Sequence, residues 1–342
     1  MRIVFFTELN SKMGAGVFDV LRASSSVTEL LLVTRADDVL CSYFLFDPDA
    51  PNLKAIARGA GIPVLQSEAI NTPEFRARIE EFAPDYLVVA NYQKKIGKKL
   101  AAIPRVAALN FHPAPLPRYA GLASFFWMAK AGETRAGTTC HLVTDVIDAG
   151  DVVGRAPIAL TGRETTGQIR DLHFAASAAL MAELLPRLAN ESLAPVPQDL
   201  RDRTYFGRPS PADTTIDWRA GVEPILRTVR ACLPHPGALA RLPNGVYVHV
   251  TSADAYRAER VGVRPGTLEK SGRDWIAATV DGWVRINSIA CFGGEAPPDP
   301  DEVAAGELVL SSDAAEFLRS DVGAEDVLAQ LMLVRAPLAL AR

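Results

Sequence analysis

The chain has 342 residues, of which 49% are hydrophobic and 22% are charged, with 24 glycines and 24 prolines. This composition is ordinary for globular proteins and excludes disordered, collagen-like and coiled-coil chains, while the length suits two domains. The formal net charge is −4. Residues 1–190 hold 20 basic and 19 acidic side chains, and residues 191–342 hold 16 basic and 21 acidic ones, so neither half has the basic excess typical of nucleic-acid binding.

Strands and helices alternate through the first part of the chain. We predict strands at residues 2–6, 29–34, 63–65, 86–91 and 106–112, helices at 15–23, 51–60 and 73–82, and a lysine-rich helix before the last strand. Pro51 suits a first helical position, and Leu53, Ile56 and Ala60 are expected to share the buried face of that helix. Such alternation predicts an α/β fold with a doubly wound, mostly parallel, Rossmann-like sheet, whose ligands bind at the carboxyl ends of the strands.

The remaining chain divides into three parts. An apolar helix follows Gly121, a strand is predicted at residues 137–144, and a long helix at 165–185 is expected to end close to Pro186. Its buried face is expected to carry Ile169, Leu172, Ala176, Leu180 and Leu184. These elements complete a catalytic domain over residues 1–190, and the proline-rich residues 191–211 are predicted to be a linker.

Residues 212–342 are predicted to form a second domain. One helix at 222–232 precedes short strands at 238–242, 246–251, 267–270, 275–279 and 283–289, and helical segments follow at 314–318 and 327–334. Short strands joined by Asn-Gly and Asp-Gly turns are typical of hairpins, so we expect a small antiparallel β-barrel with a helical tail.

The sequence also indicates a compartment. No run of 18 or more uncharged apolar residues occurs, and the first residues lack the apolar core and cleavage site of a signal peptide. The four cysteines are scattered, without a Cys-x-x-Cys pair or a nearby histidine cluster. We therefore expect a cytoplasmic protein that neither touches a membrane nor carries a disulfide scaffold or a metal site.

Asn110, His112 and Asp148 are the candidate catalytic residues. Asn110 and His112 lie two residues apart at the end of a predicted parallel strand, so their side chains project from the same face. An amide can stabilise an oxyanion, an imidazole can donate to the same oxygen or move a proton, and a carboxylate can orient the imidazole. The residues alone leave alternatives open, because Asp148 before Ala149-Gly150 is also a good turn former and His141 is interpreted as a structural histidine.

Two segments, LNFHPAPLPRYAG (109–121) and GTTCHLVTDVIDAGDVV (137–153), resemble the folate-dependent formyltransferase family. They carry its Asn-x-His, its Leu-Pro-x-Tyr-x-Gly turn, and its Gly-x-Thr-x-His followed seven residues later by Asp. The resemblance implies an enzyme that transfers a formyl group by direct amine attack, with Asn110, His112 and Asp148 as its triad. Ala114-Pro115 departs from the usual Ser-Leu of relatives, which we expect to adjust the turn only.

The resemblance further implies that 10-formyltetrahydrofolate is the donor, held between two loops and without a metal ion. Its predicted contacts are Asn91, Tyr92, Gln93, Lys94, Lys95, Ile96, Val143, Thr144, Asp145 and Ile147. Tyr119, Gly121 and Thr139 are predicted to contact the acceptor. Lys94, Lys95, Lys98 and Lys99 are expected to share a basic helix face, which is interpreted as a solvated surface or as a contact for the folate glutamate tail or an acceptor phosphate.

The acceptor is the open part of the prediction. Residues 204–205, 216–218 and 234–238 are similar to both methionyl-tRNA formyltransferases and two-domain amino-sugar formyltransferases. This resemblance implies that the predicted C-terminal β-barrel is OB-like. The tRNA enzymes carry a basic loop after the second strand, whereas residues 35–51 here hold four aspartates and only Arg35. Because acidic groups repel phosphates, we favour a small-molecule amine, such as an amino-sugar nucleotide or hydroxyornithine, over initiator methionyl-tRNA as the alternative acceptor.

Three other classes fit less well. An NAD-dependent oxidoreductase would use the same sheet, but Asp19 stands where the third glycine of Gly-x-Gly-x-x-Gly belongs. A nucleic-acid-binding barrel conflicts with the acidic second half. An inactive folate-binding relative conflicts with the complete triad.

Overall fold

The structure, a computed structural model, describes residues 1–41, 47, 49–241, 247–257, 262–272 and 274–291. The chain forms two compact units. Unit 1 comprises Met1–Ser124, Arg135–Ala159 and Arg170–Phe206, and unit 2 comprises Phe125–Thr134, Leu160–Ile169 and the chain from Gly207 onward. The chain thus passes between the units several times, whereas the sequence predicts one division between residues 190 and 211.

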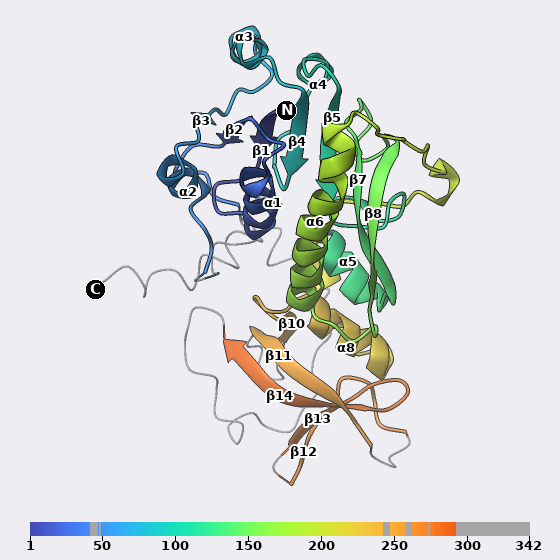
Figure 1. Cartoon of the computed structure of the whole chain (residues 1–342). Coiled ribbons are helices and arrows are strands. Elements are labelled where there is room, and N and C mark those ends of the chain that lie inside the picture. Colours follow the sequence, from blue (N-terminus) through green and yellow to red (C-terminus); the bar gives the residue numbers. More distant parts are fainter. Residues whose placement is uncertain (42–46, 48, 242–246, 258–261, 273, 292–342) are drawn as a thin grey trace, which may run out of the picture. The chain divides into compact units, whose positions relative to one another are not determined.

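Unit 1 is built on a seven-stranded sheet with the order β3-β2-β1-β4-β5-β7-β8 (Figure 1). Its strands are β1 (Arg2–Phe6), β2 (Glu29–Thr34), β3 (Val64–Gln66), β4 (Tyr86–Ala90), β5 (Ala107–His112), β7 (Arg135–Leu142) and β8 (Val152–Ala159). The first five are parallel, while β7 and β8 are antiparallel. This arrangement confirms the predicted α/β class. Strand β8 was not predicted, since its glycine and proline disfavour strands, but an edge position tolerates both.

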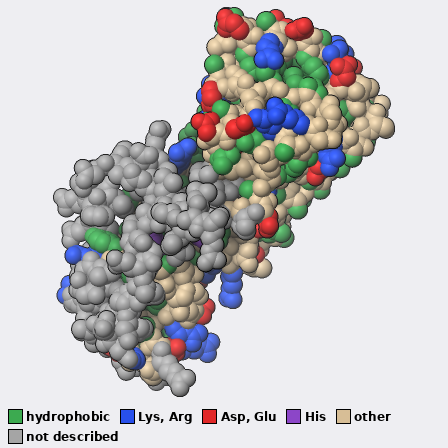
Figure 2. Space-filling model, turned by 90° about the vertical axis from the view of Figure 1, so that its left-hand side faces the viewer, with side chains coloured by type: hydrophobic (Ala, Val, Ile, Leu, Met, Phe, Trp, Pro, Cys, Tyr) green, Lys and Arg blue, Asp and Glu red, His purple; other side chains and the backbone are tan. Residues whose placement is uncertain are grey.

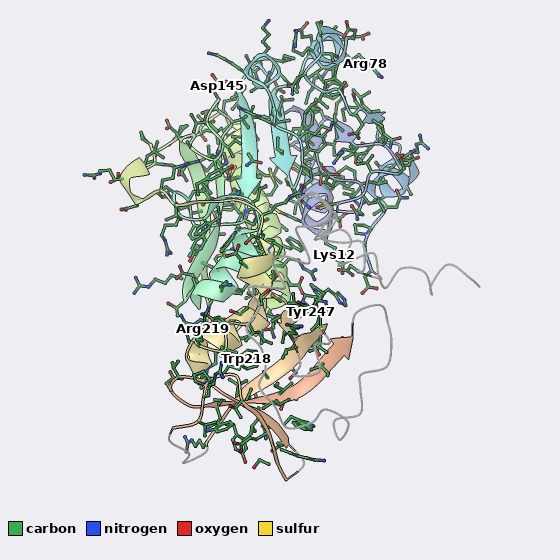
Figure 3. The ribbon with its side chains drawn as sticks, turned by 180° about the vertical axis from the view of Figure 1, so that it is seen from behind. Lys12, Arg78, Asp145, Trp218, Arg219 and Tyr247 are labelled. Atoms are coloured by element: carbon green, nitrogen blue, oxygen red, sulfur yellow. The ribbon has the colours of Figure 1, made fainter. Side chains whose placement is uncertain are left out.

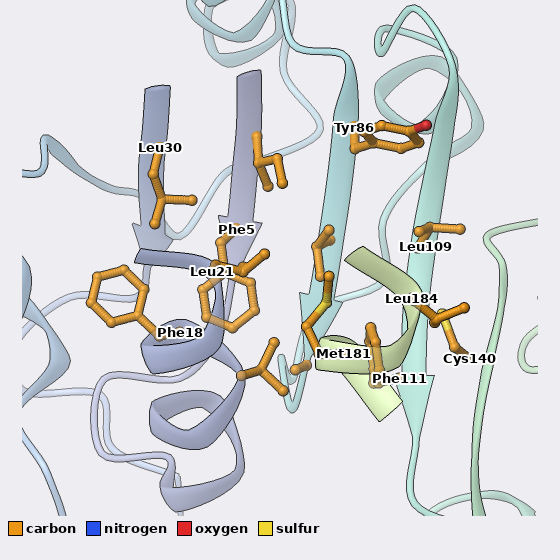
Figure 4. Packing of buried hydrophobic residues seen from close by; sticks show 14 of the residues in the cluster. Phe5, Phe18, Leu21, Leu30, Tyr86, Leu109, Phe111, Cys140, Met181 and Leu184 are labelled. Atoms are coloured by element: carbon orange, nitrogen blue, oxygen red, sulfur yellow. The ribbon is translucent and has the colours of Figure 1, made fainter. Parts of the chain in front are cut away.

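Apolar side chains alternate between the two faces of this sheet. Ile3, Phe5 and Phe111 pack on one face with helices α1 (Lys12–Ala23) and α6 (Thr166–Ala189). Figure 4 shows Phe18 and Leu21 of α1 and Met181 and Leu184 of α6 in this layer. The other face, which includes Val4 and Phe6, packs against α3 (Pro73–Phe82) and α4 (Lys98–Ala101). Because both faces are covered, the strands are continuously apolar, as in other parallel sheets.

Helices α1, α2 and α6 differ from their predicted form. Helix α1 begins earlier, at Lys12, because the Ser11 side chain caps it by accepting from the backbone N–H of Gly14. Helix α2 (Leu53–Gly59) buries Leu53 and Ala57 and leaves Ile56 and Ala60 exposed, so the predicted face is wrong by a fraction of a turn.

Helix α6 runs past Pro186 to Ala189, and its predicted face is wrong at Leu172, which is exposed. Leu184 and Leu188, on either side of the proline, are both buried. Their burial outweighs the one hydrogen bond that a proline removes.

Unit 2 contains a five-stranded antiparallel sheet with the order β10-β11-β14-β13-β12. Its strands are β10 (Ala238–Arg241), β11 (Tyr247–Tyr256), β12 (Leu268–Ser271), β13 (Asp274–Ala278) and β14 (Trp283–Cys291), and helix α8 (Val222–Ala231) contacts β11. Trp218 and Trp283 are fully buried. The predicted antiparallel β-domain is therefore present. The Asn-Gly turn at 244–245 and the predicted helices at 314–318 and 327–334 lie outside the described residues.

The remaining described elements are short: β6 (Ala120–Gly121), β9 (Tyr205–Phe206), α5 (Ser124–Ala131), α7 (Pro211–Thr214) and the 3₁₀ helix Leu200–Asp202. Strands β6 and β9 form a two-stranded parallel ladder beside the turn that follows β5. Within the described ranges, every helix is too short or too polar to span a bilayer.

Candidate active site

The predicted catalytic residues are brought together at the end of β5. In the antiparallel pairing of β5 with β7, Asn110 lies opposite His141 and His112 lies opposite Thr139. Directly opposed residues share a face of the sheet, so the register places an amide and two imidazoles side by side. The Nδ2 of Asn110 lies 3.0 Å from Nε2 of His141.

Asp148 closes this group from the loop after β7. Its Oδ2 accepts a hydrogen bond from the backbone N–H of Gly121 at 2.8 Å and lies 3.6 Å from Nδ1 of His112, while Oδ1 lies 3.5 Å from Nε2 of His141. Nε2 of His112 lies 2.9 Å from the carbonyl oxygen of Tyr119, so it carries a proton and donates it to that oxygen. All four side chains of this cluster come from unit 1.

The cluster keeps Asp148 ionised. Burial opposes the charge of this carboxylate, but the interactions with His112 and His141 and the hydrogen bond from the Gly121 N–H together hold the pKa of Asp148 well below its ordinary value. Asp148 also adopts φ of 55°, in the left-handed region that aspartate tolerates better than most residues. The site therefore holds a buried negative charge directed at two histidines.

The three predicted acceptor contacts differ in their surroundings. Tyr119 is buried, and its ring stacks on Phe206 of β9 at 5.5 Å between centroids. Gly121 adopts φ of 95°, and a Cβ there would lie 2.3 Å from the carbonyl oxygen of Phe206, so only glycine fits. The hydroxyl of Thr139, fully buried, donates to the carbonyl oxygen of Ala114 and accepts from the backbone N–H of Leu116. Thr139 thus holds the proline-rich turn.

The two predicted donor loops lie against each other. Nζ of Lys95 donates to the carbonyl oxygen of Asp145 at 2.9 Å; Asp145 is labelled in Figure 3. Tyr92, Ile96 and Val143, from both loops, belong to the apolar cluster on the sheet face of Val4 and Phe6. Asn91 has φ of 53° and donates from Nδ2 to the Ser11 hydroxyl. The exposed hydrophobic side chains of this region, Val146 and Ile147, lie directly before Asp148.

The predicted basic helix face is wrong. Helix α4 covers only Lys98–Ala101, so Lys94 and Lys95 precede it in the loop. Lys94 forms an ion pair with Glu68 at 3.1 Å, and Lys98 lies 3.6 Å from Asp145. Tertiary contacts of the loop with Glu68 and Asp145 override the i, i+4 spacing.

Glu8, a buried acid near the donor loops, was not predicted from the sequence as a site residue. Glu8 has no exposed surface, accepts a hydrogen bond from the backbone N–H of Gln93 at 2.7 Å, and leaves Oε2 without a hydrogen-bond partner. Burial raises the pKa of Glu8 despite the Gln93 N–H and the nearby Arg35. Its position two residues after β1, at the carboxyl end of a parallel strand, is the signal that could have indicated Glu8.

Two of the four aspartates in the segment after β2 form ion pairs. Asp37 pairs with Lys54 at 2.5 Å, and Asp47 pairs with Lys12 at 2.6 Å (Figure 3 labels Lys12). Figure 2 accordingly shows basic and acidic side chains interspersed over unit 1 on the face that it draws. The aspartates therefore repel phosphates less than the sequence alone suggests.

An amide, two imidazoles and a carboxylate thus meet beside the end of β5, a set of groups suited to acyl transfer. Comparisons with known proteins identify the family. Residues 1–184 match the formyl transferase family and residues 209–306 match the formyl transferase C-terminal domain. The chain belongs to the formyltransferase family, as its sequence motifs predicted. Within the described residues, histidine, cysteine and acidic side chains do not gather in threes that could hold a metal ion.

The relatives and solved structures that this chain resembles differ in what their names state that they bind or act on. Methionyl-tRNA formyltransferase of Aromatoleum aromaticum is 34% identical over 190 residues, which are 56% of this chain and 60% of that protein. An N-formyltransferase from Helicobacter canadensis, solved with folinic acid and dTDP-3-aminofucose, matches 84% of this chain and 99% of its own at a TM-score of 0.61 and 14% identity. HypX from Aquifex aeolicus, solved with tetrahydrofolic acid, matches 85% of this chain and 44% of its own chain, at a TM-score of 0.57 and 18% identity.

Proposed function

We propose that this protein is a 10-formyltetrahydrofolate-dependent N-formyltransferase. The observation that carries the proposal is the convergence of Asn110, His112 and Asp148 within one buried cluster of a chain that belongs to the formyltransferase family. The folate derivatives in two solved relatives support the donor, and the contact between the loops at residues 91–96 and 143–148 supports its predicted position.

In the proposed reaction, the neutral acceptor amine attacks the formyl carbon and a tetrahedral oxyanion forms. An N–H of Asn110 donates to this oxygen, and His112 as an imidazolium stabilises it electrostatically. Asp148 stabilises the imidazolium and relays the amine proton toward N10 of the folate. The bond between the formyl carbon and N10 then breaks, which releases tetrahydrofolate and the formylated amine. We propose that Thr139 acts on the acceptor site through the proline-rich turn that its hydroxyl holds.

For the acceptor we propose a small-molecule amine, either an amino-sugar nucleotide or an amino-acid derivative such as hydroxyornithine. The segment at residues 35–51 lacks the basic residues expected for an acceptor stem, and its ion pairs leave no surplus of positive charge among its described residues. The amino-sugar nucleotide in the Helicobacter canadensis complex supports the same class. We place the protein in the cytoplasm, where folate cofactors and these amines meet.

Initiator methionyl-tRNA is the second candidate acceptor, because the 34% identity to methionyl-tRNA formyltransferase favours it. The deciding experiment follows tetrahydrofolate release from 10-formyltetrahydrofolate with amino-sugar nucleotides, with hydroxyornithine, and with charged initiator tRNA. Release that depends on a small amine supports the proposal. Release that depends only on the tRNA contradicts it.

A further inference from the structure

His141 has an environment that a merely structural histidine does not need. It lies opposite Asn110 in the β5–β7 ladder and is 3% exposed. Its Nδ1 lies 2.8 Å from the carbonyl oxygen of Leu142, and its Nε2 lies 3.0 Å from Nδ2 of Asn110 and 3.5 Å from Oδ1 of Asp148. Both ring nitrogens are therefore directed at specific partners.

The Leu142 contact fixes the proton of this ring. A carbonyl oxygen only accepts, so Nδ1 of His141 must carry a hydrogen. In the neutral imidazole Nε2 is then an acceptor, and its partner at hydrogen-bond distance is the amide N–H of Asn110. The carboxylate of Asp148 lies farther away, with Oδ1 3.5 Å from Nε2 of His141, and its other oxygen, Oδ2, accepts from the Gly121 N–H.

This arrangement determines how the Asn110 amide is turned. With its NH₂ group toward His141, the amide uses one N–H for the imidazole and keeps the second N–H for another acceptor. The opposite orientation would place the amide oxygen against the lone pair of Nε2, so that two acceptors would face each other. Protonated His141 would instead place an N–H against the NH₂ group of Asn110 and favour the opposite orientation.

We propose that neutral His141, with its proton on Nδ1, is a positioning residue that holds the Asn110 amide with an N–H available to the oxyanion. This inference rests on the proposed formyl transfer. It assigns His141 no contact with the substrate, and its effect passes entirely through Asn110.

The test compares two variants of His141. His141→Leu keeps an apolar side chain of similar length without an acceptor, whereas His141→Gln places an amide oxygen close to the position of Nε2. We expect the leucine variant to lower kcat by about 10²-fold, the usual loss for one oxyanion donor, with the KM of the donor unchanged. The glutamine variant should retain most of the turnover, and both should melt at the wild-type temperature.

Non-additivity provides the sharper readout. In an Asn110→Ala background, His141→Leu should cause little further loss, because the two residues act as one unit. Losses that multiply would overturn the inference, as would equal losses in His141→Leu and His141→Gln.

Nitrogen NMR of the wild-type protein tests the tautomer separately. The chain has five histidines, so the His141 signals are those that disappear in His141→Gln. A protonated Nδ1 and an unprotonated Nε2 are expected, and a proton on Nε2 would overturn the inference. This measurement needs no turnover, so a wild type that is inactive with every acceptor would refute the proposed function while the spectrum still decides the tautomer.

Discussion

Replacing Asp148 with asparagine tests the electrostatic core of the proposed mechanism. The change removes the negative charge and keeps the shape, and asparagine also tolerates the left-handed backbone at this position. Its amide oxygen can still accept from the Gly121 N–H. What is lost is the attraction between a carboxylate and an imidazolium whose atoms are 3.6 Å apart.

The separation of these two groups sets the magnitude. Two unit charges at 3.6 Å attract each other by about 5 kcal/mol at an effective dielectric constant of about 20, a value suited to groups as buried as these. Since about 1.4 kcal/mol corresponds to tenfold in rate, Asp148→Asn should lower kcat/KM by roughly 10³-fold. Because the pKa of Asp148 is held far below neutrality, protonation of this group should not produce the acidic limb of the wild-type pH–rate profile.

The assay is tetrahydrofolate release with the preferred amine, together with a thermal melt of each variant. Asp19→Asn, an exposed aspartate that is not among the predicted donor or acceptor contacts, is the matched control and should change the rate little. A folded Asp148→Asn protein within tenfold of wild type would refute the reasoning, since the carboxylate would then stabilise no charge that forms during the reaction.

Three further changes have defined outcomes. Gly121→Ala should lower both turnover and melting temperature, because its φ of 95° disfavours alanine by about 1–2 kcal/mol and its Cβ would meet a backbone oxygen of β9. Gly59→Ala is the control: this glycine has open space around it, so the change should lower neither turnover nor melting temperature. Gly14→Ala should destabilise the protein by about 1–3 kcal/mol in denaturant unfolding because its Cβ would lie 1.9 Å from the Thr7 hydroxyl, and no recovery upon adding Thr7→Ala would contradict this contact. Glu8→Gln should raise the melting temperature near neutral pH. Because burial raises the pKa of Glu8, the stability that Glu8 contributes is present at low pH and is lost as the pH rises through that pKa. A gain in melting temperature that persists unchanged at acidic pH would count against this account.

The sequence by itself determined the elements and the motif. Continuous apolar strands and the Thr72-Pro73 helix start are local signals, so β1, β2 and α3 were placed within a residue of their observed bounds. Asn110 and His112 were also predictable together, because side chains two apart on a strand share a face.

Tertiary structure alone decided the partners of those residues. The antiparallel register of β5 and β7 brings His141 to Asn110, and the loop after β7 returns Asp148 to His112 and Gly121. Neither follows from local periodicity, because a register shift of one residue would turn these side chains to the opposite face. The predicted helix face of Lys94, Lys95, Lys98 and Lys99 is wrong for the same reason. Contacts with Glu68 and Asp145, which are distant in sequence, outweigh the weak helical preference of this short segment.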